Sequence, residues 1–320
     1  MSESTVSHGY SRPPTSFEIG ADRVFRGLTR LTAWLAVGLV FLIVFQIART
    51  AYPAIQEHGI KFLTTSKWDP GAKKFGILPQ IGGTLYSSIL GVAIGSIFGI
   101  AVAIFITQDF LPPKLELAIK NVVELLAAIP SVVYGLWGIF VVIPTIRPFC
   151  NWLYASFGSI PIFGSRLAGP GMLPAALVLA IMVLPTVTAI SRDAIVAVPP
   201  KLREAAFGLG ATRWETILGI ILPTASRGIY GSVILAFGRA VGETMALAML
   251  LGNNNSFEWS LFSPGNTLAA LMANQWPESG QIEKGALMYA GLVLLCITLL
   301  INIVGTLILQ RTVQMGEPQR

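Results

Sequence analysis

The chain has 320 residues, of which 53% are hydrophobic and 12% are charged, and its mean hydropathy is +0.69. Soluble domains carry about 25% charged residues, so this composition excludes an ordinary soluble domain. It predicts an all-α polytopic membrane protein, because in lipid every backbone polar group must be satisfied within the protein. The net charge of +6 does not indicate nucleic-acid binding, because nearly all basic residues fall in loops between apolar runs.

The first residues are polar and carry Ser, Pro and Thr, which indicates a mobile cytoplasmic tail at 1–20 ahead of a transmembrane domain at 21–320. No short apolar region with a small-residue cleavage site follows, so the first span is expected to be retained. A helix needs roughly 20 apolar residues to cross the bilayer. Uncharged runs predict six such spans, at 31–47, 83–107, 122–145, 172–190, 228–251 and 286–309.

The basic residues of the loops favour one orientation. If the amino terminus is cytoplasmic, the inner segments hold thirteen Lys or Arg residues and the outer segments hold eight. Because basic residues are enriched on the cytoplasmic side, both termini are expected there. The outer loop 253–284 is rich in aromatic residues, and its segment 267–275 reads as a short apolar helix. That helix either dips into the membrane or lies flat on it, and the plainer interpretation of the loop is an interfacial aromatic belt.

Residue types that carry enzymatic chemistry are scarce. Cys150 and Cys296 are far apart and give no metal-site spacing, so both are interpreted as apolar filler, and neither a metal nor a cofactor is expected. The two histidines, His8 and His58, lie in the tail and in an outer loop. The sequence holds no Gly-rich P-loop followed by Lys and Ser or Thr. We therefore expect no catalytic residues and no enzyme activity in this chain.

A charged pair interrupts the fifth predicted span. Arg239 and Glu243 stand in the run Gly238-Arg239-Ala240-Val241-Gly242-Glu243-Thr244, and an isolated Arg costs about 2.5–3.5 kcal/mol at the bilayer centre on insertion scales. A spacing of four places both charges on one helical face, within pairing reach. The pair is either a structural ion pair between helices or a polar pathway in which Arg239 binds a passing oxyanion and Glu243 holds Arg239 in place.

A charged cytoplasmic loop, 191–227, joins the fourth and fifth spans. Residues 201–209 are predicted to be helical, Gly210 supplies a break, and 213–221 restarts the helix before Leu222-Pro223. Arg203 and Glu204 are expected to point at solvent or a partner, and Ala205 and Ala206 to allow close packing. On chemistry alone this loop is either a docking element or an ordinary surface helix.

The spacing of this loop matches a known family. The order Glu204-Ala205-Ala206, three residues, Gly210, nine residues, Ile220, one residue, Leu222-Pro223 resembles the EAA loop of permease subunits of ABC importers. That resemblance implies a type I importer permease fold. It also implies a coupling helix that sits in a cleft of a separate P-loop ATPase, with Glu204, Ala205, Ala206 and Gly210 at the contact.

A second resemblance concerns the solute. The run 238–244, the segment Ile129-Pro130-Ser131-Val132-Val133-Tyr134-Gly135 and the run Gly82-Gly83-Thr84-Leu85 look like permeases of the phosphate-specific (Pst) importer. The tail, the long first outer loop and Trp68-Asp69-Pro70 are more similar to the PstC-type than to the PstA-type subunit. The resemblance implies that Arg239 and Glu243 serve phosphate passage. The implied partners are a PstA-type permease, a dimeric PstB-type ATPase and an external PstS-type phosphate-binding protein.

The sequence thus predicts a multi-pass subunit of the cell membrane that forms, with a homologous permease, the path for inorganic phosphate. Two alternatives remain open at this point. One is an ABC permease for another oxyanion or small solute. The other is an ATP-independent channel or secondary transporter, which often contains inverted repeats. No internal repeat is visible, and such a protein would leave the EAA spacing unexplained.

Overall fold

The structure is a computed structural model that describes residues 15–108 and 110–314. By their contacts the residues divide into two units, Met1–Arg49 and Thr50–Arg320. The first fourteen residues of the predicted tail lie outside the described residues, but helix α1 (Ser16–His58) begins before position 20. The start of α1 is capped by two reciprocal hydrogen bonds. The Thr15 amide donates to Glu18 Oε2 at 2.7 Å and the Glu18 amide donates to Thr15 Oγ1 at 3.3 Å, as in a capping box.

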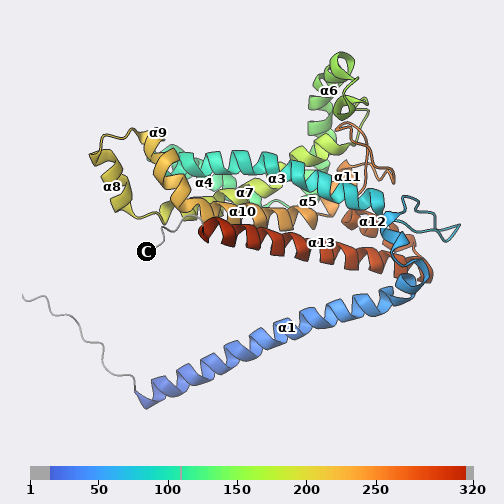
Figure 1. The fold of residues 1–320 in the computed structure, drawn as a ribbon, viewed down its shortest axis with the longest axis horizontal. Coiled ribbons are helices and arrows are strands. Elements are labelled where there is room, and N and C mark those ends of the chain that lie inside the picture. The colour runs from blue at the N-terminus through green and yellow to red at the C-terminus, as the bar shows by residue number, and fades with distance from the viewer. Residues whose placement is uncertain (1–14, 109, 315–320) are drawn as a thin grey trace, which may run out of the picture. The chain divides into compact units, whose positions relative to one another are not determined.

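Helices make up most of the second unit within the described residues (Figure 1). In chain order they are α2 (Lys61–Thr64), α3 (Leu78–Thr107), α4 (Pro113–Ala128), α5 (Ser131–Trp137), η1 (Gly138–Val142), α6 (Ile143–Phe157), η2 (Pro161–Phe163), α7 (Met172–Val196), α8 (Pro200–Gly208), α9 (Arg213–Thr216), η3 (Ile217–Ile221), α10 (Leu222–Val241), α11 (Met245–Leu250), α12 (Leu268–Gln275), η4 (Trp276–Glu278) and α13 (Gln281–Gln314). Six helical stretches are long and apolar enough to cross a membrane, which confirms the all-α, six-span prediction.

Helix α7 is the centre of the second unit and packs closely along α3. The contact uses glycines spaced four residues apart on α3, Gly91, Gly95 and Gly99. A Cβ on Gly95 would lie 2.7 Å from the Ala180 carbonyl oxygen, and a Cβ on Gly99 would lie 2.9 Å from Val187 Cβ. Small residues at this spacing let membrane helices approach backbone to backbone. Helix α7, which carries the Arg239 contact residue Thr186, is therefore held tightly against α3.

The third predicted span, 122–145, is wrong in its bounds because the chain breaks inside it. Helix α4 ends at Ala128, and Ile129 and Pro130 adopt extended backbone before α5 begins. Proline lacks an amide hydrogen and disfavours helical geometry in the residue before it, which accounts for the break. The stretch that qualifies as a span by length and composition is Ser131–Phe157. Absence of charge, the criterion behind 122–145, cannot detect such a break.

The fifth predicted span, 228–251, is also discontinuous. Helix α10 begins within the predicted cytoplasmic loop, at Leu222, and ends at Val241, and α11 starts at Met245. The three residues between the helices are Gly242, Glu243 and Thr244. This break falls at the charged segment that the sequence singled out, so it changes the geometry of the candidate site.

The outer segment 267–275 packs into the bundle. Leu268, Ala270 and Leu271 of α12 are fully buried, in contact with α3, α11 and α13. The Leu268 amide donates to Thr84 Oγ1 on α3 at 3.0 Å, and a Cβ on Gly83 would overlap the Asn266 carbonyl oxygen. Of the two readings left open by the sequence, a segment that folds back into the bundle describes α12 better than a helix lying flat on its surface.

Candidate substrate path and coupling surface

Arg239 lies in the last turn of α10 and is exposed on the second unit. Its Nη1 donates to Thr186 Oγ1 of α7 at 3.3 Å. Leu235, four residues earlier on the same helix, is also exposed, so it shares a face with Arg239. Because a guanidinium inside a span does not tolerate bare lipid, this face needs a water-filled cavity or a second subunit over it.

Glu243 does not pair with Arg239, contrary to the expectation from their spacing. Its Oε1 accepts a hydrogen bond from the Ala246 amide at 3.3 Å, in the first turn of α11. The ion pairs within the described residues are Arg26–Asp22 and Lys67–Asp69. The helix ends at Val241, so the one-turn geometry that a spacing of four implies does not apply. Glu243 thus bonds to the start of α11, and Arg239 bonds to Thr186 instead.

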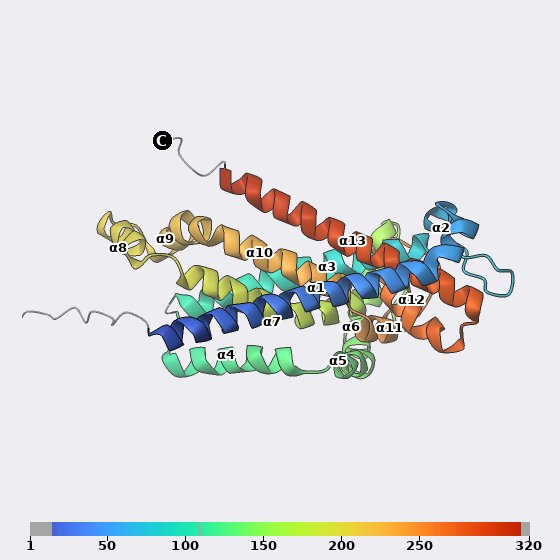
Figure 2. The same ribbon diagram turned by 90° about the horizontal axis from the view of Figure 1, so that it is seen from below.

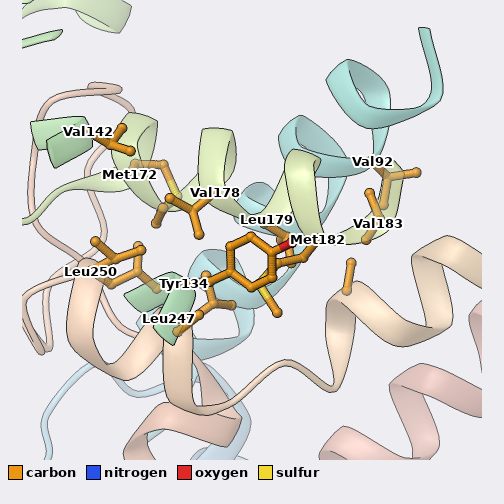
Figure 3. Packing of buried hydrophobic residues seen from close by; sticks show 14 of the residues in the cluster. Val92, Tyr134, Val142, Met172, Val178, Leu179, Met182, Val183, Leu247 and Leu250 are labelled. Carbon is orange, nitrogen blue, oxygen red and sulfur yellow. The ribbon is translucent and has the colours of Figure 1, made fainter. Parts of the chain in front are cut away.

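Tyr134 belongs to the same region and was not singled out as a site residue. It is almost fully buried on α5, shares a hydrophobic cluster with Ala240 of α10, and donates from its hydroxyl to the Leu126 carbonyl at 2.8 Å, across the break between α4 and α5. Figure 3 shows its ring among Leu179 and Met182 of α7 and Leu247 of α11. Tyr134 therefore holds the α4–α5 break against α11 and against α7, which carries Thr186.

Two residues in the region of Arg239 could have been suspected from the sequence. Thr186 is a hydroxyl residue directly after Pro185 in an otherwise apolar run, and Tyr134 falls in the segment 129–135 that carried the family resemblance. Their proximity to Arg239 depends on the packing of α5, α7 and α10, which no local pattern specifies. An apolar cavity of about 230 Å³ opens beside Tyr134, lined by Leu126, Ile129, Val133, Tyr134, Trp137 and Ile181.

The loop 191–227 forms the helix that the sequence predicted, α8, which ends at Gly208, two residues before Gly210. Gly210 has φ +84°, the left-handed region that favours glycine. The next helix, α9, starts with a capping box, because Thr212 Oγ1 accepts from the Glu215 amide at 3.4 Å and Glu215 Oε2 accepts from the Thr212 amide at 2.7 Å. Gly210 and the capping box together set the angle between α8 and α9.

Most of α8 is exposed, including most of the residues expected at an ATPase contact. Glu204, Ala205 and Gly210 are exposed, and so are the large apolar side chains Leu202, Phe207 and Leu209. Ala206 is 3% exposed, so its methyl group packs inside the chain and is not available to a partner. Of the four residues expected at an ATPase contact, three are accessible. The fourth, Ala206, packs the helix against the rest of the chain.

Arg203 does not point at solvent, which corrects the expectation from the loop. It turns back to α7 and donates from Nη2 to the Ile195 carbonyl at 3.1 Å, while its Nε is buried without a partner among the described residues. The last carbonyls of a helix lack intrahelical donors, and a cation there is favoured by the helix dipole. The coupling helix is thereby tied to the same helix, α7, that carries Thr186.

Solved structures define the class of fold. The chain resembles a chain in the structure of the MetNI methionine ABC transporter, with a TM-score of 0.55 and 16% identity over 74% of this chain and 95% of that chain. It also resembles a chain of a bacterial alginate ABC transporter, with a TM-score of 0.60 and 17% identity over 89% of this chain and 93% of that chain. The fold is that of a type I ABC importer permease.

Sequence comparison then places the chain in its family. Residues 95–314 match the family described as binding-protein-dependent transport system inner membrane component. The phosphate transport system permease proteins PstC of Mesorhizobium japonicum and Haemophilus influenzae are 38% and 37% identical to it, over 91% and 92% of this chain and 90% and 94% of theirs. The probable PstC of Methanocaldococcus jannaschii is 36% identical over 82% of this chain and 85% of its own. The chain belongs to this family of multi-pass transport permeases, within its PstC group.

Proposed function

We propose that this chain forms, together with a homologous permease, the membrane path for inorganic phosphate in an ABC importer. The observation that carries the proposal is the exposed guanidinium of Arg239 inside an apolar bundle. Guanidinium donors match the oxygens of phosphate, and the relatives named as phosphate permeases fit that chemistry. The open face of α10 is where the second, PstA-type permease would close the path.

The proposed machine draws its energy from another subunit. A dimeric PstB-type ATPase would grip the exposed face of α8, and an external PstS-type protein would deliver phosphate to the outer loops. Both termini would then lie in the cytoplasm, on the side of α8 and α9. Because the sequence has no P-loop, ATP hydrolysis is assigned to the ATPase subunit and solute passage to this chain.

Helix α7 supplies a route for coupling between the two regions. Arg203 joins α8 to Ile195, and Thr186, nine residues earlier on α7, contacts Arg239. At 1.5 Å per residue these two contacts lie roughly 14 Å apart along one helix. A displacement of α8 by the ATPase would therefore move the partner of Arg239 without an intervening loop. A site with one arginine and one hydroxyl also binds weakly enough for release, as conduction requires.

Competition for uptake tests the choice of solute. The complete transporter in proteoliposomes, with ATP enclosed on the ATPase side, is expected to accumulate radiolabelled phosphate. We expect excess unlabelled phosphate to abolish the signal, and sulfate or molybdate at the same concentration to leave most of it. Uptake that sulfate or molybdate suppresses equally well would favour the alternative of a permease for another oxyanion. Equal uptake without ATPase or ATP would favour a channel.

A further inference from the structure

The segment 131–157 qualifies as a membrane span by hydropathy, but its second half does not run in the spanning direction. Figure 1 shows α6 (Ile143–Phe157) running across the direction shared by α3, α7, α10 and α13. A π-helical turn, η1, separates α6 from α5, and π-turns are local irregularities that often mark functional positions. Length and composition alone therefore misassign this stretch.

The direction of the chain supports the same reading. Helix α7 leads into the cytoplasmic α8, and α3 ends at the same end of the bundle, beside α9 and α10 (Figure 2). The chain must therefore return to the outer end between α3 and α7. Helix α4 lies along α3 and α7, and its 16 residues measure about 24 Å at 1.5 Å per residue. Helix α4 makes that crossing, which leaves α6 free to lie in the membrane plane.

One side of α6 is fixed to the outer end of the second unit. Cys150 is fully buried and packs with Leu167 and Phe262. Asn151 Oδ1 accepts a hydrogen bond from the Leu167 amide at 3.0 Å. Phe262 belongs to the outer loop that precedes α12, so these contacts place α6 near the outer end of the spans.

The opposite side of α6 presents aromatic rings. Phe149 and Trp152 are 60% and 57% exposed, and their ring centroids stack at 6.0 Å. Cations lie along the flank, where Arg147 is exposed and the Arg166 guanidinium sits 5.4 Å from the centre of the Tyr154 ring. Outward Trp and Phe beside Arg and Tyr are typical of helices at a membrane interface, where rings enter the acyl boundary and cations reach the headgroups.

We propose that α6 is an in-plane interfacial helix, with Phe149 and Trp152 inserted among the phospholipids of the outer leaflet. Its neighbour on that face is lipid, because the helix lies across the spans and carries the aromatic and cationic side chains that suit the acyl–headgroup boundary. The proposal does not depend on which solute the transporter carries.

Site-directed spin labelling measures the depth of α6 directly. In the full chain within its transporter complex, in lipid nanodiscs, Cys150 and Cys296 are replaced by alanine and one nitroxide is placed at position 149, 152 or 156. Collision with oxygen and with a water-soluble nickel chelate gives the depth of each label. Positions 299, 303 and 307, on the exposed face of the spanning helix α13, serve as the matched control.

The account expects the three α6 labels at one depth near the headgroups, while the α13 labels shift by about 6 Å for every four residues. A spanning α6 would instead separate positions 149 and 156 by about 10 Å, and that result would overturn the proposal. Labels on α6 that neither oxygen nor the nickel chelate reaches would show a protein neighbour on this face, which would also overturn it.

Discussion

Replacing Arg239 with alanine is expected to reduce ATP-dependent phosphate uptake by about ten- to a hundredfold. Hydrogen bonds to charged groups contribute about 1.5–3 kcal/mol, and each 1.4 kcal/mol corresponds to about a factor of ten. Arg239→Lys keeps the positive charge but loses the planar fork of donors, so its uptake is expected to fall between those of the wild type and the alanine variant. The measurement is radiolabelled phosphate uptake by the purified complex in proteoliposomes.

Arg227→Ala is the matched control for this substitution. Arg227 is exposed on the same helix, α10, twelve residues before Arg239, and we expect its removal to leave uptake within about twofold of the wild type. The amount of assembled complex, measured by co-purification of all subunits, is expected to be normal for both variants. Loss of assembly in Arg239→Ala would contradict a role in solute passage and would support a structural role.

Gly210→Pro is expected to detach the ATPase from this chain. Proline fixes φ near −65°, whereas Gly210 has φ +84°, and proline also removes the amide that donates to the Phe207 carbonyl at 3.0 Å. With about 3 kcal/mol or more of strain, the native end of α8 becomes more than about a hundredfold less populated. Co-purification of the ATPase and phosphate-coupled ATP hydrolysis are both expected to fall below detection.

Two further variants separate docking from folding. Gly208 lies two residues earlier, and a Cβ there would meet nothing within 4 Å, so Gly208→Ala is expected to keep the ATPase bound. Glu204→Lys changes only an exposed charge on α8 and is expected to weaken co-purification without loss of the folded permease. If Gly210→Pro and Glu204→Lys both retain the ATPase and transport normally, α8 is not the docking helix.

Sequence patterns that span only a few residues predicted much of this fold. The prediction of six apolar runs follows from composition, because lipid imposes the same requirement on every span. The helix ahead of Gly210 and the restart at Arg213 follow from local capping chemistry, in which a left-handed glycine and a Thr–Glu capping box act over three or four residues.

The failures share a physical cause, since each depends on what lies across the bundle. The absence of charge predicted one continuous span across Pro130. The chain breaks there, and the Tyr134 hydroxyl donates to the Leu126 carbonyl across the break. The four-residue spacing predicted an ion pair between Arg239 and Glu243. The helix ends between them, and each side chain has another hydrogen-bond partner. Arg203 was expected in solvent and is held by the end of α7. Tertiary packing decides all three outcomes, and local sequence patterns do not encode that packing.

The same limit applies to Ala206. The EAA spacing groups it with Glu204 and Ala205, yet successive helical residues point in different directions. In the structure Ala206 is buried and its two neighbours are exposed. A motif therefore identifies the helix, and the packing of that helix decides which of its residues meet a partner.

The central claim is that water and anions reach Arg239, and thiol chemistry at this position tests it most directly. In a transporter with Cys150→Ala and Cys296→Ala, Arg239→Cys is treated with a water-soluble methanethiosulfonate that attaches an ethylammonium group. The account predicts that the thiol reacts, that phosphate slows the reaction, that its rate changes with ATP, and that the attached ammonium restores part of the lost uptake. A thiol at position 239 that reacts from neither side, with or without ATP, would contradict the account.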